Sequence, residues 1–223
     1  MNLFANTLFD LSGHAAIVTG GSRGIGRAIA ERLAQHGANV VVCGRKIETA
    51  EAVARAINER DGGRAIAVAC NITRQDEIEN LVAKARESFQ QIDILVANAG
   101  LHIHFGPSAE MTDAILEKTL DGNFRALHRL SQILLPAMIE NGWGRIINIG
   151  SISAHFGSGV YHSYTLSKSL AMQYVRNLAV EHGTAGVRAN TISPGLIRTD
   201  MARGLIEDEA ELRKELDRST VGR

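Results

Sequence analysis

The sequence predicts an α/β fold in which a parallel sheet is doubly wound, with helices on both of its faces. Short apolar runs alternate with amphipathic segments along the chain. The apolar runs are hydrophobic throughout instead of alternating with polar residues, which is typical of strands that helices cover on both faces. Strands separated by helices need crossover connections, and these produce a parallel sheet. The 223 residues fit one domain of this class, 1–223.

Six apolar runs are predicted to be strands, and five amphipathic segments are predicted to be helices. The strands are Ala15–Val18, Asn39–Cys43, Arg64–Ala69, Ile92–Val96, Arg145–Ile149 and Val187–Ile192. The helices are Ile25–His36, Ile47–Arg60, Gln75–Phe89, Ile115–Glu140 and Ser163–His182. Gly37 follows the first helix and Gly62-Gly63 the second, as is common where helices end. Because ligands bind beyond the carboxyl ends of strands in such sheets, the residues after each strand are candidate site residues.

Composition and charge limit the classes of function. The 24 Lys and Arg residues balance 24 Asp and Glu residues, and no basic block stands out. We therefore expect neither nucleic acid nor a membrane as a partner. The two cysteines, Cys43 and Cys70, form no metal-ligand pattern, which predicts a reduced, cytoplasmic protein without a metal. Met1–Ser12 lacks the pattern of a signal peptide, and no apolar run is long enough to cross a bilayer.

A glycine-rich turn, Thr19–Gly26, follows the first predicted strand and opens the first predicted helix. Glycines allow the backbone to pass close to a pyrophosphate, and the unpaired N–H groups at a helix start favour an anion. A structural turn without a ligand is the alternative interpretation. The position between a strand and a helix favours dinucleotide binding, because this is the context that such binding needs.

The residues after the second strand predict which dinucleotide is bound. A site that prefers NAD usually has a carboxylate here to hold the ribose 2′-hydroxyl. This chain has Gly44, followed by Arg45 and Lys46, and Arg23 lies in the glycine turn. A carboxylate would repel a 2′-phosphate, whereas guanidinium groups bind it with charge-assisted hydrogen bonds. The pattern favours NADP(H) over NAD(H), the alternative being that Arg45 and Lys46 are only solvated residues at a helix start.

A tyrosine and a lysine near the start of the last predicted helix are candidate catalytic residues. Tyr164 and Lys168 are four residues apart and can share a helix face. The pKa of a free tyrosine is about 10, and a nearby ammonium or an oxidised nicotinamide would lower it. Such a pair alone is common on surface helices. Here Ser151 and the sequence Asn98-Ala99-Gly100 follow two predicted strands, which brings them to the same edge of the sheet as the glycine turn.

Taken together, these motifs resemble the classical short-chain dehydrogenase/reductase family, and within it the 3-oxoacyl-carrier-protein reductase branch. The matching residues are Thr19-Gly20, Gly24, Gly26, Asn98-Ala99-Gly100, Asn123, Ser151, Tyr164, Lys168, Pro194-Gly195 and Thr199. They cover nearly the whole chain, in the order and at the intervals of the family. The resemblance implies a Rossmann-like fold and an enzyme that transfers a hydride between NAD(P)(H) and a carbonyl or a secondary alcohol.

The resemblance also implies a role for each matching residue. Tyr164 would be the general acid in reduction and the base in oxidation, and Ser151 would hydrogen-bond the substrate oxygen. Lys168 would bind the nicotinamide ribose and lower the pKa of the tyrosine, and Asn123 would anchor a water that links Lys168 to solvent. The implied cofactor-binding residues are Gly20, Ser22, Arg23, Gly24, Ile25 and Gly26 for the phosphates and ribose, Asn71 and Ile72 for adenine, Asn98 and Gly100 for the central part, Tyr164 and Lys168 beside the nicotinamide, and Pro194, Gly195, Ile197 and Thr199 for its carboxamide.

Two rival side chains and four histidines lie near these candidates. Ser151 is preferred to Ser153 because it precedes Tyr164 by thirteen residues, the spacing of the family. Tyr161 is disfavoured because Thr165, not a lysine, stands four residues after it. The histidines near the implied substrate pocket have no metal-binding spacing, and we interpret them as pocket-lining or solvent-facing. They are His102, His104, His155 and His162.

Substrate and assembly stay open at this stage. A small-molecule substrate is expected, whether a 3-oxoacyl thioester, a steroid, a sugar or a polyol, and a non-catalytic NADP(H)-sensing module is the alternative. The resemblance implies a homodimer or homotetramer for a full-length chain. Family members continue beyond a Gly-Arg such as Gly222-Arg223 into another helix and a last strand. The chain is therefore expected to lack these elements, which would leave Val187–Ile192 as an exposed apolar edge.

Overall fold

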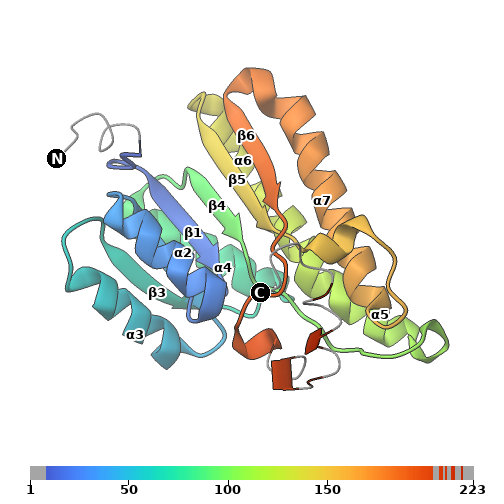
Figure 1. The fold of residues 1–223 in the computed structure, drawn as a ribbon. Helices are drawn as coiled ribbons and strands as arrows, with labels where there is room; N and C mark the ends of the chain where they lie inside the picture. The colour runs from blue at the N-terminus through green and yellow to red at the C-terminus, as the bar shows by residue number, and fades with distance from the viewer. Residues whose placement is uncertain (1–8, 203–205, 208, 210–211, 214–216, 218–223) are drawn as a thin grey trace.

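The computed structural model describes residues 9–202, 206–207, 209, 212–213 and 217. This part of the chain forms a six-stranded sheet in the order β3-β2-β1-β4-β5-β6, and all neighbouring strands are parallel. Helices cover both of its faces (Figure 1). The strand order reverses between β1 and β4, which are neighbours in the middle of the sheet. The predicted doubly wound, Rossmann-like fold is confirmed.

All six predicted strands are present, with ends that differ by at most two residues. The strands are β1 (Ala15–Thr19), β2 (Asn39–Gly44), β3 (Ala65–Ala69), β4 (Ile94–Ala97), β5 (Gly144–Ile149) and β6 (Val187–Ile192). The main helices are α2 (Gly24–Gln35), α3 (Ile47–Asn58), α4 (Gln75–Phe89), α5 (Asp113–Leu120), α6 (Ala126–Glu140) and α7 (His162–His182). None of the described helices is long and apolar enough to cross a membrane.

One predicted helix, Ile115–Glu140, is wrong as a continuous α-helix. It is divided into α5, a π-helical turn over Asp121–Arg125, and α6. Leu101 packs against this turn, and a Cβ on Gly122 would lie only 2.5 Å from the Leu101 Cδ1 atom. The neighbouring Asn123 side chain makes hydrogen bonds to the Leu101 backbone. The wider turn thus accompanies close packing between this helix and the loop after β4, and such turns frequently lie at functional sites.

Apolar side chains on the two faces of the sheet form two cores. Ile17, Val41 and Leu95 pack on one face with residues of α4, α6 and α7. The next residues along β1 and β2, Val18 and Val42, pack on the other face with residues of α2 and α3. Successive side chains of a strand point to opposite faces, so burial on both faces needs unbroken apolar runs. The sequence pattern therefore has a direct structural cause.

The edge strand β6 is an exception to this pattern. Among the described residues it pairs with β5 alone. Val187 and Ala189 are buried, whereas Arg188 and Asn190 are exposed and Ile192 is 54% exposed. The edge that the sequence predicts as apolar is thus half polar, because one face of β6 packs on α7 and the alternate residues face solvent.

Candidate active site

A cleft of about 920 Å³ lies at the carboxyl end of the sheet. It is lined by the turns that follow β1, β2, β3, β4, β5 and β6, together with the start of α7. Every predicted catalytic and cofactor-binding residue lines it except Asn123. The residues after each strand therefore line one cleft, and their assignment as a binding and catalytic site stays a prediction.

The glycine turn after β1 is fixed to the turn after β4 by hydrogen bonds. The Thr19 hydroxyl accepts from the backbone N–H groups of Asn98 and Ala99, both at 3.0 Å. The Asn98 amide donates to the carbonyls of Thr19 at 2.9 Å and Gly20 at 3.2 Å. Gly20 has a φ of 63°, and a Cβ on Gly26 would overlap the Gly20 carbonyl and the Asn98 side chain. Glycine at these two positions therefore lets the two turns meet.

The start of α2 fits an anionic group. The helix begins at Gly24, and its N-cap residue Arg23 makes no side-chain capping hydrogen bond. The first N–H groups of a helix have no partner within the helix, so they can bind an anion when no side chain caps them. Arg23 and Arg45 are both exposed and both line this end of the cleft. The donor set is therefore suited to the phosphates of a dinucleotide.

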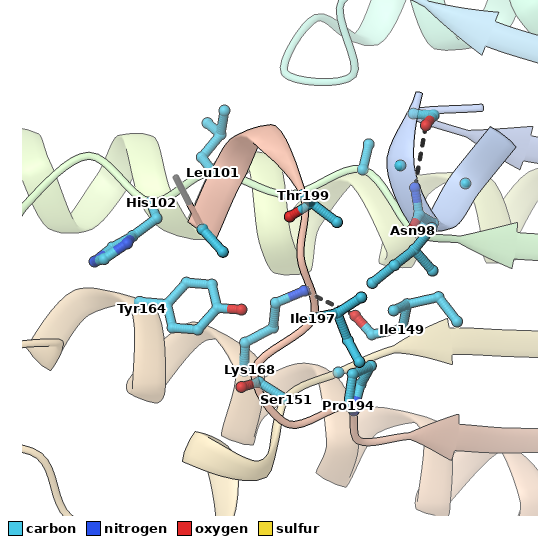
Figure 2. Close-up of a pocket in the computed structure, with 18 of the residues that line it drawn as sticks. Asn98, Leu101, His102, Ile149, Ser151, Tyr164, Lys168, Pro194, Ile197 and Thr199 are labelled. Carbon is cyan, nitrogen blue, oxygen red and sulfur yellow. Dashed lines mark hydrogen bonds between the residues drawn. The ribbon is translucent and has the colours of Figure 1, made fainter. Parts of the chain in front are cut away.

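Tyr164, Lys168 and Ser151 meet at the opposite end of the cleft. Tyr164 and Lys168 lie one turn apart on α7, and in Figure 2 their polar ends point into the same pocket. The Lys168 Nζ atom lies 5.7 Å from the centroid of the Tyr164 ring and donates to the Ile149 carbonyl at 2.8 Å. Ser151 accepts hydrogen bonds from the backbone N–H of Ser153 at 3.2 Å and from its hydroxyl at 2.8 Å. Ser153 thus supports Ser151.

Burial changes the proton affinities of Tyr164 and Lys168. Burial raises the pKa of Tyr164, and a hydrogen bond with Ser151 lowers it only in part. The net pKa of Tyr164 is therefore raised, because desolvation is the larger of these two effects. That the ammonium of Lys168 lowers the pKa of this tyrosine stays a prediction. Lys168 is only 4% exposed, and burial lowers its pKa to about 8.

Asn123 lies behind the cleft and holds the loop after β4. Its Oδ1 atom accepts from the Leu101 N–H at 2.6 Å, and its Nδ2 atom donates to the Leu101 carbonyl and to the Ser167 hydroxyl, both at 2.9 Å. Ser167 in turn donates to the Tyr164 carbonyl at 2.7 Å. Asn123 is therefore connected through Ser167 to the turn of α7 that carries Tyr164. Its role as a water anchor stays a prediction.

The ring of Tyr164 belongs to a group of aromatic side chains that line the cleft. The His102 ring lies 5.1 Å from the rings of both Tyr161 and Tyr164, measured between centroids, and Phe105 lies 5.1 Å from Tyr161. Burial lowers the pKa of His102. Of the four histidines considered above, His102 lines the cleft, whereas His155 is exposed. Among the described residues, no group of three or more His, Cys, Asp or Glu side chains could hold a metal ion.

Comparison with known proteins shows the family. The family model described as short chain dehydrogenase matches residues 14–210. The chain belongs to the short-chain dehydrogenase/reductase family. It is 36% identical over 200 residues to the 3-oxoacyl-[acyl-carrier-protein] reductase FabG of Escherichia coli, and the alignment covers 90% of this chain and 80% of that protein. It is 34% identical over 201 residues to dehydrogenase/reductase SDR family member 4 of Oryctolagus cuniculus, and that alignment covers 90% of this chain and 77% of the other protein.

Solved structures of other short-chain dehydrogenases have the same fold. A 7α-hydroxysteroid dehydrogenase in complex with NADH and 7-oxo glycochenodeoxycholic acid has a TM-score of 0.89 and 34% identity, covering 99% of this chain and 84% of that one. A protein described as an NAD(P)-dependent gluconate 5-dehydrogenase from Beutenbergia cavernae, with bound NADP at low occupancy, has a TM-score of 0.88 and 33% identity, covering 96% and 85%. This short-chain dehydrogenase is therefore an NAD(P)-dependent oxidoreductase acting on a CH–OH group or a carbonyl.

Sequence reasoning missed several residues that organise the site of this short-chain dehydrogenase. Ser153, Ser167 and Leu101 make hydrogen bonds to three of the predicted catalytic side chains or to their backbone. The spacing to Tyr164 identifies Ser153 only as a rival to Ser151. A sequence signal existed for Ser167, because it lies three residues after Tyr164 and can bond to that residue's carbonyl within the helix. No pattern in the sequence indicates the contact between Leu101 and Asn123.

Proposed function

We propose that this chain transfers a hydride between NADP(H) and a carbonyl or secondary alcohol, with Tyr164 as the general acid or base. The observation that carries the proposal is the convergence of Tyr164, Ser151 and Lys168 in one cleft, at the end opposite Arg45. Reduction of a carbonyl needs hydrogen-bond donors and a proton source close to the carbonyl oxygen. The hydroxyl groups of Ser151 and Tyr164 can supply both. A non-catalytic NADP(H)-binding module would not need the hydroxyls of Ser151 and Tyr164 to meet at a substrate oxygen.

The chain's own residues account for the proton transfer. NADPH, when bound, supplies the hydride. Negative charge then develops on the substrate oxygen, and the hydroxyls of Ser151 and Tyr164 would donate hydrogen bonds to it. Ser153 donates to the Ser151 oxygen, so the Ser151 proton is left to be donated to the Tyr164 oxygen or, when substrate is bound, to the substrate oxygen. Because burial keeps Tyr164 as the neutral phenol, the side chain carries the proton that completes the alcohol.

The preference for NADP(H) rests on the end of β2. Gly44 occupies the position where a carboxylate would hold a ribose 2′-hydroxyl. A Cβ on Gly44 would already lie 3.1 Å from the Ser22 hydroxyl oxygen, so a longer side chain would crowd the glycine turn. Arg45 follows directly and lines the cleft, and its guanidinium group suits a phosphate. NADP and NADH are each bound by one of the solved relatives, so this preference needs its own test.

Arg45→Ala is expected to raise the Kd for NADPH about tenfold, since a hydrogen bond to a charged group contributes about 1.5–3 kcal/mol and this side chain is exposed. The Kd for NADH is expected to change little, because NADH has no 2′-phosphate. Fluorescence titration of both cofactors measures the two constants. Lys46→Ala is the matched control, because Lys46 is the next basic residue but does not line the cleft. Equal losses for NADPH and NADH would contradict the phosphate assignment.

The activity itself is tested with a panel of carbonyl compounds and the absorbance of NADPH. The panel contains a 3-oxoacyl thioester, an oxo sugar acid and an oxo steroid, which are the chemical classes that the names of the relatives suggest. Oxidation of NADPH with at least one carbonyl compound supports the proposal. Tight NADPH binding without turnover on any of them would favour a sensing module. We further propose a small-molecule substrate, a homodimer or homotetramer for a full-length chain, and a cytoplasmic location.

A further inference from the structure

An ion pair joins two segments that line the cleft beside the start of α2. The Arg23 Nη1 atom lies 3.2 Å from the Asp200 Oδ2 atom. Arg23 belongs to the glycine turn before α2, whereas Asp200 starts a short 3-10 turn after β6, so the contact connects residues 177 positions apart. The neighbouring residues also touch, because a Cβ on Gly24 would lie 3.3 Å from the Thr199 Cγ2 atom. The segment after β6 therefore rests on the turn that is expected to bind phosphate.

Asp200 is unusual in its position. It is the one acidic side chain among the described residues that line the cleft, and the basic residues Arg23 and Arg45 line the same cofactor end. A carboxylate there is unfavourable for a cofactor that carries several phosphate charges. The ion pair with Arg23 compensates its charge in the chain alone. This argument rests on the proposed function, because it takes Arg23 as a ligand of the cofactor phosphates.

We propose that Asp200 sets the affinity and selectivity for NADP(H) by competing with the 2′-phosphate for Arg23. A phosphate ester carries a charge of about −1.5 to −2 at neutral pH and accepts paired hydrogen bonds from a guanidinium group. The Arg23 guanidinium cannot form paired hydrogen bonds with the Asp200 carboxylate and the 2′-phosphate at once. NADP(H) therefore has to displace Asp200 from Arg23. NAD(H) has no 2′-phosphate and makes no such demand. Asp200 thus acts through Arg23, as a positioning residue.

Displacement of Asp200 also has a consequence for the segment after β6. Ile197 and Thr199 lie on this segment and line the cleft, as Figure 2 shows. In the chain alone, the Arg23–Asp200 ion pair ties the segment to the glycine turn. When NADP(H) takes Arg23, this tie is lost. Arrival of the 2′-phosphate therefore changes the restraints on a segment that borders the nicotinamide end.

Asp200→Asn is expected to lower the Kd for NADPH and to leave the Kd for NADH within experimental error. The expected gain in NADPH affinity is about two- to fivefold. It is small because the Arg23 and Asp200 side chains are 65% and 49% exposed, and exposed ion pairs are weak. Asparagine keeps the size of the side chain and an oxygen acceptor, so the short turn after β6 is preserved. Asp200→Glu keeps the charge and is expected to retain the wild-type preference. Glu31→Gln breaks the 2.8 Å ion pair with Arg27 on α2, outside the cleft, and is the matched control.

A double-mutant cycle with Arg23→Gln shows whether Asp200 acts through Arg23. In the Arg23→Gln background, Asp200→Asn is expected to have no further effect on NADPH binding. An equal gain in that background would mean direct repulsion of the phosphate and would overturn the proposal. It would also be overturned by weaker binding of both cofactors, or by an unchanged Kd for NADPH, in Asp200→Asn. Failure of the cofactor assignment itself is distinguishable, because neither Arg23→Gln nor Arg45→Ala would then weaken NADPH binding.

Discussion

Tyr164→Phe is expected to lower kcat by about 10²- to 10⁴-fold, the usual contribution of a general acid or base, while the Kd for NADPH stays within about twofold of wild type. The substitution removes the hydroxyl that we propose as the proton donor and that forms a hydrogen bond with Ser151. It keeps the ring that packs 5.1 Å from the His102 ring, so the cleft retains its shape. Steady-state kinetics measures the loss of turnover, and titration of NADPH fluorescence measures the retained binding.

Tyr161→Phe is the matched control for this experiment. Tyr161 lines the same cleft and packs against His102 and Phe105, but it lies outside the pair that Tyr164 forms with Lys168. Its variant is expected to keep kcat within a few-fold of wild type. If Tyr164→Phe kept its turnover, another group would have to supply the proton. If both variants lost turnover equally, the assignment of the acid to Tyr164 alone would be wrong.

Lys168→Met is expected to change how the free energy of unfolding depends on pH. Burial lowers the pKa of Lys168 from its ordinary 10.5 to about 8, so the folded state disfavours the ammonium. Below pH 8 the folded and unfolded states both hold the Lys168 proton, and the buried ammonium destabilises the folded state to its full extent. Between pH 8 and 10.5 the unfolded state still binds this proton, whereas the folded state has released it. The stability contributed by this group therefore rises with pH across that window, by on the order of 3 kcal/mol for a shift of this size.

The measurement is urea denaturation of wild type and Lys168→Met at a series of pH values through this window. The difference in the free energy of unfolding, wild type minus variant, is expected to be flat below pH 8 and to rise above it. Lys84→Met, at an exposed position on α4, is the control for the loss of a lysine as such. Parallel profiles for wild type and Lys168→Met would contradict a buried ammonium at this site.

The sheet and its order of elements were predictable because burial on both faces leaves a strong signal in the sequence. Runs such as 15–18 and 40–43 are apolar without interruption, and a helix separates them. The π-helical turn at Asp121–Arg125 leaves no such signal. Its amphipathic pattern nearly continues that of a regular helix, and the hydrogen bond between Asn123 and Leu101 lies within this turn. Contacts between distant residues decide such details, and hydrophobic periodicity does not report them.

The position of the candidate site was predictable for a related reason. Parallel strands bring their carboxyl ends to one edge, so the order of elements alone placed the glycine turn, Ser151 and Tyr164 in one cleft. The electrostatics were not predictable. Spacing identified Lys168 as a neighbour of Tyr164, but the depth of burial determines the direction of the pKa change. The Arg23–Asp200 ion pair likewise joins segments whose contact appears only in the folded chain.

Transfer of deuterium from labelled NADPH tests the central claim most directly. NADPH that carries deuterium at the reactive position of the nicotinamide is incubated with the chain and a carbonyl compound that it reduces. The account predicts that the alcohol product carries one deuterium on its carbinol carbon for each NADPH oxidised, because the hydride passes directly between the two molecules in the cleft. Alcohol that carries solvent hydrogen at this carbon, with the label lost to water, would contradict it.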